Sequence, residues 1–398
     1  MTGVYRLRMS ALTILGDKVG LMVRWTWLVA CGALFMGCGN STSGPESGSG
    51  PWTEWEGTTQ GTTFRFVWDG TGMEEVREAA LDSILRAVDD AVNLWNPNSD
   101  LVRLNQWDAA KGEFVFMDST QILTLLWLRS EEIWTATGGA FDPTVGPLVE
   151  LWGFGIARAD SVTPEEVALA MQSVGFSSEN CALSEIEDAQ GNALTSIAKR
   201  KPRMSFDFNA IAQGYTVDLI ADFLKSKGAK NGMIEIGGEV RCWGTNRKNE
   251  PWHIAIDAPV AETGTGRVFD AIALVDDAAI CTSGSYRKFR EVDGKRISHA
   301  IDPSTGYPVA HNLISATIRA HTAATADALA TACLVMGPDR GRAFIEAYRD
   351  AHLEEKIDAY FLMSEPQGGW SSWMTPGWTG NLIPVDQNAA AVPSSTPE

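Results

Sequence analysis

An aspartate and a threonine four residues apart are the first candidates for chemistry. Asp327 and Thr331 lie in TAATADALATACLVMG, residues 322–337, where most neighbours are Ala, Leu, Val or Cys. Helical spacing puts the carboxylate and the hydroxyl on one face of a largely buried helix. A buried carboxylate must be paired or must coordinate a metal. The alternative is structural: Asp327 bonded to nearby backbone amides and Thr331 bonded back to its own helix.

The segment DFNAIAQGYTVD, residues 207–218, offers a second set of oxygen atoms. Asp207 ends the strand-like stretch RMSFDF, and the small residues from Ala210 to Ala212 begin a helix. Such a helix start binds phosphate, and an unpaired carbonyl beside it can ligate a hard cation. The alternative is that Asp207 only caps a tightly packed helix.

Aromatic residues at two turns could stack on a flat ring system. ATGGAFDPTVGPLVELWGFG, residues 136–155, is predicted to be a shaped loop in which Phe141 packs on a ring and Asp142 accepts a hydrogen bond. Trp95 precedes a proline turn in NLWNPNSDLVRLN. The alternative is that both are core aromatics at loop ends.

Two turns carry further polar groups. CTSGSYRK, residues 281–288, offers Ser283, Ser285 and backbone amides, unless it is a plain surface loop. In SHAIDPSTGYP, residues 298–308, His299 precedes a turn that Pro303 and Gly306 fix. His299 either caps this turn or is held there for proton transfer. No H-E-x-x-H, G-x-S-x-G or Walker motif is present.

The elements that would position these residues mix helices and strands without a regular βαβ repeat, which predicts an α+β fold. Hydrophobic periodicity and glycine stops predict four helices and five strand-rich segments. The helices are expected within residues 72–95, 119–138, 210–228 and 322–337, the last ended by Gly337, and the strands within 58–68, 231–244, 251–259, 268–284 and 313–320.

Composition limits the function. The formal net charge of −18 argues against nucleic-acid binding, because phosphates need Lys and Arg partners. The six cysteines show neither a C-x-x-C motif nor metal-ligand spacing, so the four in the body of the chain are expected to be buried free thiols.

The N-terminal region is similar to a bacterial lipoprotein signal. MVRWTWLVACGALFMGC, residues 22–38, has a basic residue, a short apolar run and a final Gly-Cys pair. Cys38 is the expected lipidated residue, with Cys31 as the alternative, and translation starting at Met22 suits the signal best. We expect a flexible linker over 39–51, one catalytic domain over 52–385 and a disordered tail over 386–398.

The segments quoted above that begin with NLWNPN, ATGGAFDP, DFNAIAQG, CTSGSYRK and SHAIDPSTG, followed in the chain by ADALATA (residues 326–332), resemble the FAD:protein FMN transferases of the ApbE type. Their order along the chain also matches that family, and the resemblance covers roughly residues 55–380. The resemblance implies a single α+β catalytic unit that needs Mg²⁺, cleaves FAD, transfers FMN to a Thr or Ser hydroxyl of an acceptor protein and releases AMP. The acceptors would be flavoprotein subunits, such as those of redox-driven membrane complexes. The enzyme would be lipid-anchored through Cys38 on the periplasmic side of the membrane, with the inner membrane favoured.

The resemblance also implies roles for individual residues. The metal ligands would be the Ala210 carbonyl, Asp327 and Thr331, and His299 would be the catalytic base. FAD contacts would come from Trp95, Ala140, Phe141, Asp142, Asp207, Gln213 and Ile301. The chain departs from the family pattern at Gln60, often Met, at Gln213, often Lys or Glu, and at Ala330, often Ser.

Two other functions fit the same blocks. One is an FAD pyrophosphatase, in which water replaces the acceptor hydroxyl. The other is a periplasmic flavin-binding lipoprotein without turnover. The pair of Asp327 and Thr331 argues against a pure binder, because holding a flavin does not require metal ligands.

Overall fold

The computed structural model describes residues 52–71, 76–155, 161–259, 269–285, 289–292 and 295–385 of the 398. The expected signal peptide with Cys31 and Cys38, the linker and the tail lie outside these residues. Among the helices that the structure describes, none has the length and apolar character needed to cross a membrane.

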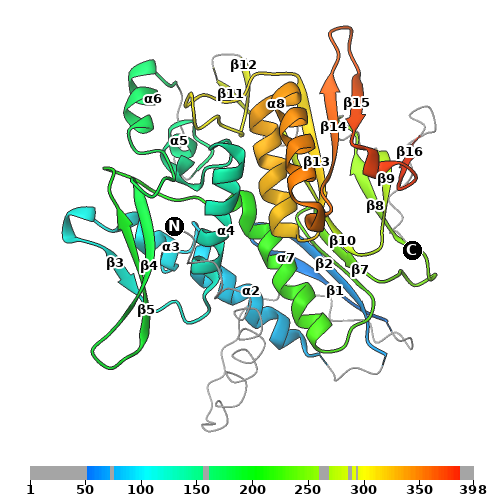
Figure 1. Cartoon of the computed structure of the whole chain (residues 1–398), viewed down its shortest axis with the longest axis horizontal. Helices are drawn as coiled ribbons and strands as arrows, with labels where there is room; N and C mark the ends of the chain where they lie inside the picture. Colours follow the sequence, from blue (N-terminus) through cyan, green and yellow to red (C-terminus); the bar gives the residue numbers. More distant parts are fainter. Residues whose placement is uncertain are drawn as a thin grey trace, which may run out of the picture.

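An eight-stranded antiparallel sheet forms the centre of the protein, and its strands follow one another in chain order (Figure 1). The mixture of this sheet with packed helices confirms the predicted α+β class. The strands, in their order across the sheet, are β1 (Trp52–Thr59), β2 (Thr62–Asp69), β6 (Gly232–Ile236), β7 (Glu239–Trp243), β10 (Ala278–Gly284), β13 (Leu313–Ala320), β14 (Asp358–Ser364) and β15 (Trp370–Met374).

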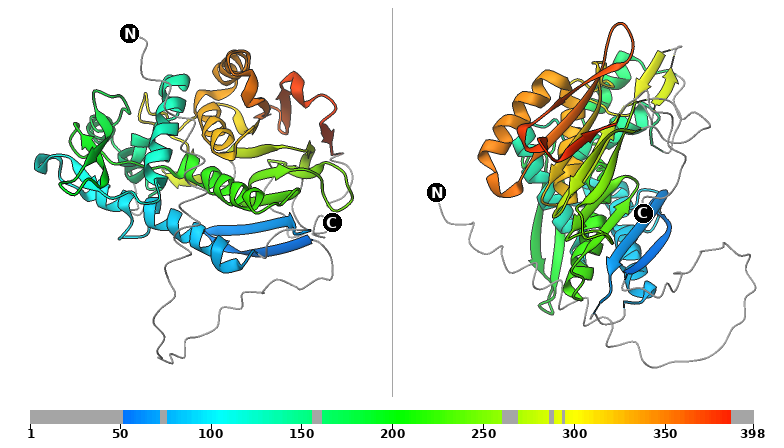
Figure 2. Two further views of the ribbon diagram at one scale, coloured as in Figure 1. Left: turned by 60° about the horizontal axis from the view of Figure 1, so that its bottom comes forward. Right: turned by 90° about the vertical axis from the view of Figure 1, so that its right-hand side faces the viewer.

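The two faces of this sheet are covered differently. Helices α7 (Asn209–Ser226) and α8 (Ala323–Ala351) lie side by side on one face, over Ile236 and Cys281 (Figures 1 and 2). The opposite face, with Val240, packs against a small sheet of β8 (Trp252–Asp257), β9 (Phe269–Val275) and β16 (Leu382–Pro384). Because side chains alternate along a strand, neighbouring residues of β7 and β10 belong to different cores.

The remaining elements lie around the helical face. They are α2 (Glu78–Val92), α3 (Asp100–Gln106), α4 (Ile122–Thr137), α5 (Gly146–Leu151), α6 (Pro164–Met171), the sheet β3 (Phe114–Phe116), β5 (Ala193–Lys199) and β4 (Cys181–Glu187), the hairpin β11 (Phe289–Val292) and β12 (Lys295–Ser298), and the short turns η1 (Ala109–Lys111), η2 (Pro143–Val145) and η3 (Leu353–Glu355). The turn η4 (Pro376–Trp378) lies on the opposite face, where Trp378 is buried in the same core as Val240.

Several predicted elements differ from the structure. The expected strand over 58–68 is a hairpin, because Gln60 and Gly61 both have positive φ (50° and 74°), which suits a two-residue turn. RMSFDF forms no strand and runs irregularly into α7. The expected loop over 136–155 contains η2 and α5, since prolines at the first turns favour helix starts. The prediction of buried free thiols is confirmed for all four cysteines that the structure describes.

Gly337 interrupts α8 as predicted, although the helix resumes immediately at Pro338. Its φ of 78° and ψ of 180° lie in a region that is essentially restricted to glycine. A Cβ at this position would lie 2.7 Å from Cδ2 of His311, whose Nε2 pairs with the Leu334 carbonyl at 2.9 Å. The histidine thus satisfies a carbonyl at the end of the first helical segment.

We expect Gly337→Ala to lower the free energy of unfolding by more than about 1–3 kcal/mol, the cost of backbone strain in this region alone, because the added Cβ would also contact His311. Gly380→Ala is the matched control, because Gly380 has φ 81° and no heavy atom within 4 Å of an added Cβ. Urea unfolding of both variants measures the difference. Equal losses would show that neither the ψ of 180° nor the contact with His311 adds to the cost of a positive φ.

Candidate active site

Helices α7 and α8 approach each other most closely at a glycine. A Cβ on Gly214 would lie 2.3 Å from the Ala323 carbonyl oxygen and 2.9 Å from Cβ of Asp327. No side chain fits there, so glycine allows the beginning of α8 to pack directly on α7. This contact brings together the two segments in which the sequence predicted metal ligands.

Asp327 binds the backbone of the other helix. Its Oδ2 accepts a hydrogen bond from the Gly214 N–H at 3.1 Å. In a regular helix that N–H donates to the carbonyl of residue 210. The Asp327 carboxylate thus lies at the turn whose Ala210 carbonyl is the predicted second ligand. A carbonyl oxygen has two lone pairs, so Ala210 retains acceptor capacity even when its helix bond is made.

Thr331 lies one turn further along α8 and reaches the sheet. Its Oγ1 pairs with Oγ of Ser283 on β10 at 2.9 Å. The alternative in which Thr331 bonds back to its own helix is therefore not the arrangement found. The structural alternative for Asp327, a carboxylate bonded to backbone amides, is partly met, because the Gly214 N–H donates to it.

The beginning of α8 is held by Asp218, which the sequence analysis did not single out. The two carboxylate oxygens of Asp218 accept from the N–H groups of Ala323 and Ala324, both at 2.9 Å, and Oδ1 also accepts from Arg241 at 2.8 Å. Burial raises the pKa of Asp218, and the Arg241 charge opposes that rise. The sequence feature that could have identified Asp218 is an acid among apolar residues of a predicted helix, one turn after Gly214.

A second buried carboxylate, Glu239 of β7, faces the same region and was also missed. Only 8% of Glu239 is exposed. Burial and then the charge of Asp327 raise its pKa well above the ordinary range, while the Cys281 thiol and the Thr282 backbone N–H bind its carboxylate. The Cys281 thiol is also 3.4 Å from the Ala323 carbonyl oxygen. Burial raises the pKa of Cys281, so it remains a neutral donor.

The donor set here fits a hard divalent cation. It consists of carboxylate, hydroxyl and carbonyl oxygens, which Mg²⁺ prefers. Among the residues that the structure describes, no three His, Cys, Asp or Glu side chains converge as a metal cluster. A cation held by Ala210, Asp327 and Thr331 would have three protein oxygens as ligands, which would leave coordination positions for substrate oxygens.

The predicted flavin contacts of the 136–155 segment lie next to Asp207. The Asp207 N–H donates to the Pro143 carbonyl at 2.7 Å, and Asp207 Oδ1 accepts from the N–H of Asn209 at 2.8 Å. Burial raises the pKa of Asp207. Asp207 therefore binds the first turn of α7 and joins it to the loop, whether or not it also binds a ligand.

Asp142 already has internal partners for both carboxylate oxygens. Oδ1 accepts from the N–H and the hydroxyl of Thr144, and Oδ2 accepts from Trp134 Nε1 and the Phe176 N–H. Burial raises its pKa. With Ala140 and Phe141 also buried, this carboxylate shapes the loop that the sequence predicted as a flavin contact.

His299 follows β12 and enters a turn anchored on α5. Trp152 Nε1 donates to the Gly306 carbonyl at 2.8 Å, and Ile301 is buried against Leu148 and Trp152. The His299 ring lies edge-on to Phe154, with ring centroids 6.4 Å apart. The turn that follows His299 is therefore anchored on α5, and Phe154 lies beside the imidazole.

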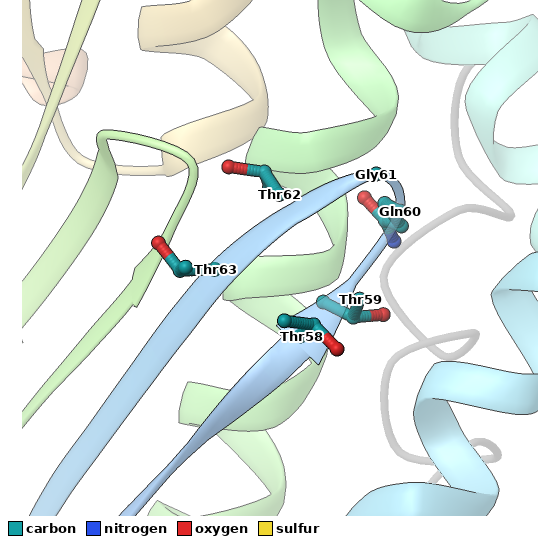
Figure 3. Close-up of a pocket in the computed structure, with 6 residues that line it drawn as sticks. All are labelled: Thr58, Thr59, Gln60, Gly61, Thr62 and Thr63. Carbon is teal, nitrogen blue, oxygen red and sulfur yellow. The ribbon is translucent and has the colours of Figure 1, made fainter. Parts of the chain in front are cut away.

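The remaining predicted contacts lie around the tip of the β1–β2 hairpin and the end of α2. Figure 3 shows Gln60 and Gly61 at that tip, in a hollow of about 440 Å³ beside α7. Gln60 Nε2 donates to Thr216 Oγ1 at 2.8 Å, so its side chain is engaged with α7. Gln213 Nε2 lies near Gly237, in the turn between β6 and β7. Trp95, 63% exposed, lies just beyond α2.

A family profile described as the ApbE family matches residues 57–359. The chain belongs to the ApbE family. Two relatives named FAD:protein FMN transferase support this assignment. The relative from Vibrio cholerae is 36% identical and covers 81% of this chain and 90% of its own length. The relative from Klebsiella pneumoniae is 32% identical, and the match covers 89% of this chain and 96% of the relative.

Solved ApbE structures share the fold. The flavin transferase ApbE from Vibrio cholerae has a TM-score of 0.69 at 34% identity, covering 85% of this chain and 100% of its own. The flavinyl transferase ApbE from Pseudomonas stutzeri, in its apo form, has a TM-score of 0.68 at 30% identity. The match covers 82% of this chain and 96% of the Pseudomonas stutzeri chain. The predicted ApbE-like fold is thus confirmed over nearly the whole described part of the chain.

Proposed function

We propose that this ApbE-family chain is an FAD:protein FMN transferase that uses Mg²⁺. The observation that carries the proposal is the contact between Asp327 of α8 and the Gly214 N–H of α7. It brings a carboxylate to the turn of the Ala210 carbonyl, with Thr331 one helical turn away. The relatives named above carry the same activity in their names.

In the proposed reaction, an acceptor Thr or Ser hydroxyl attacks the FMN phosphorus of FAD. The new P–O bond joins FMN to the acceptor, the P–O bond to AMP breaks, and AMP leaves. An imidazole nitrogen of His299 takes the hydroxyl proton. Trp95, Ala140, Phe141, Asp142, Asp207, Gln213 and Ile301 would orient the flavin half. Ala210, Asp327 and Thr331 would hold Mg²⁺, which when bound neutralises developing charge on the pyrophosphate oxygens.

The direct test incubates the domain over 52–385 with FAD, Mg²⁺ and candidate acceptor flavoprotein subunits. We expect a fluorescent flavin adduct of the acceptor in a denaturing gel, together with stoichiometric AMP. AMP and FMN without an adduct would identify an FAD pyrophosphatase instead. Flavin binding with neither product, for every acceptor tried, would identify a flavin-binding protein without turnover.

We also propose that Cys38 is lipidated and anchors the enzyme on the periplasmic side of the membrane, on the strength of the signal-like sequence over 22–38. Cys38→Ala is expected to leave an unlipidated precursor that loses the lipid anchor. Membrane fractionation and mass spectrometry of the N-terminus measure both effects. Cys31→Ala is the control and is expected to be processed normally. An unmodified N-terminus downstream of Cys38 in the native protein would contradict the proposal.

A further inference from the structure

Glu239 is a buried carboxylate that the proposed reaction does not yet use. Its Oε2 is buried and accepts no hydrogen bond from any residue that the structure describes. An unsatisfied buried oxygen of this kind costs free energy unless something else binds it. Glu239 begins β7, directly after the Gly237–Gly238 turn that contacts Gln213.

The position of Glu239 in the sheet directs its side chain toward α8. Glu239 pairs with Ile236, whose side chain belongs to the core beneath α7 and α8. The Cys281 thiol and the Thr282 N–H of β10 lie beside its carboxylate and favour its ionised form. Ser283, next on the same face of β10 after Cys281, is the partner of Thr331. Glu239, Ser283, Thr331 and Asp327 thus lie on the same side of the sheet, where α8 packs on it.

In the absence of a cation, burial and the charge of Asp327 disfavour the ionised form of Glu239. A divalent cation bound nearby would favour the ionised form instead, since it would attract both carboxylates. The unpartnered oxygen of Glu239 and its position near Asp327 both fit a cation bound on this side of α8.

We propose that Glu239 is a further protein ligand of the cation site, binding the divalent cation directly or through one of its waters. The inference rests on the cation site proposed above and extends it from α7 and α8 to the central sheet. Glu239 anchors the cation from the sheet side, opposite Asp327. A ligand from β7 also couples the cation to the turn that contacts Gln213.

Glu239→Gln tests this, because it keeps the shape and the acceptor oxygen but removes the charge. Mn²⁺ binding is followed by electron paramagnetic resonance, and the Mg²⁺-induced rise in Tm by calorimetry, each without and with FAD. We expect Kd for Mn²⁺ to rise about 10–100-fold and the Mg²⁺-induced rise in Tm to shrink. The metal-free Tm should stay unchanged or increase, because an unsatisfied buried acid has been removed.

Glu235→Gln is the matched control. Glu235 lies in the same hairpin and pairs with Val240, so its side chain is on the opposite face of the sheet. This variant should bind Mn²⁺ like the unmodified protein. If Glu239→Gln does not fold, Glu239→Asp keeps the charge on a shorter side chain and is expected to fold and to bind Mn²⁺ more weakly.

The outcomes separate this inference from the cation site itself. Unchanged Mn²⁺ affinity in Glu239→Gln or in the folded Glu239→Asp, or a lower metal-free Tm with an unchanged Mg²⁺ effect, would make Glu239 a structural residue and overturn the inference alone. Absence of Mn²⁺ binding by the unmodified protein, with or without FAD, would overturn the cation site and Glu239 together.

Discussion

Replacing Asp327 by alanine is expected to abolish FAD cleavage, with a fall in rate of at least about 10³-fold. A cation that neutralises charge in a transition state is worth several kcal/mol, and each 1.36 kcal/mol is a factor of about ten in rate. Asp327 is the only charged residue among the three ligands carried over from the family pattern. The measurement is AMP release from FAD at saturating Mg²⁺.

The structure adds a variant that separates chemistry from packing. Asp327→Asn keeps an oxygen that can accept from the Gly214 N–H, so the contact between α7 and α8 should survive. Both variants should lose activity while circular dichroism stays unchanged. Asp339→Ala, at an exposed acid of the same helix beyond Gly337, is the control and should keep full activity. Turnover like that of the unmodified protein in Asp327→Asn, with Mg²⁺ present, would contradict the metal assignment.

Replacing His299 by alanine is expected to slow flavin transfer by about 10²–10⁴-fold, the usual worth of a general base. FAD affinity should change little, because Ile301 and the turn that follows are held by α5 through Trp152. Single-turnover transfer to an acceptor and FAD titration by flavin fluorescence measure the two quantities separately.

His253→Ala is the control for this experiment, since His253 is an exposed histidine of β8. It should leave both transfer and FAD affinity unchanged. If FAD binding collapses together with transfer in His299→Ala, the histidine is a binding or structural residue. If both survive, it only shapes its turn.

Much of the central sheet and its helices could be predicted from local pattern. The alternation in LISATIRA matches β13 to the residue, and Gly138 ends α4 in the left-handed conformation expected of a helix stop. Both signals are local: a side-chain period and a glycine that tolerates positive φ. The β4–β5 hairpin was missed because β4 is largely exposed and has no buried alternating face.

Site residues could be predicted from the sequence where they lie on one helix or strand. Residues that reach the site only because two distant segments pack together could not be predicted. Asp327 and Thr331 were found because four-residue spacing defines a helical face. Glu239 was not found, because a glutamate after two glycines looks like part of an exposed turn. Its burial arises from the packing of α8 on the sheet, a contact between residues far apart in the chain. Asp142 was predicted to accept a hydrogen bond, but the sequence did not show that four donors from within the protein bind its carboxylate.

The glycine contact between α7 and α8 has a consequence for the free energy of ligand binding. The backbone N–H of Gly214 and the carboxylate of Asp327 are bonded across 113 positions of sequence, with no space between the helices for a side chain. Neither helix can shift without breaking this contact, so the two helices keep a fixed separation before any ligand arrives. Little conformational entropy is then lost when a ligand binds beside this contact, and more of the interaction free energy appears as affinity.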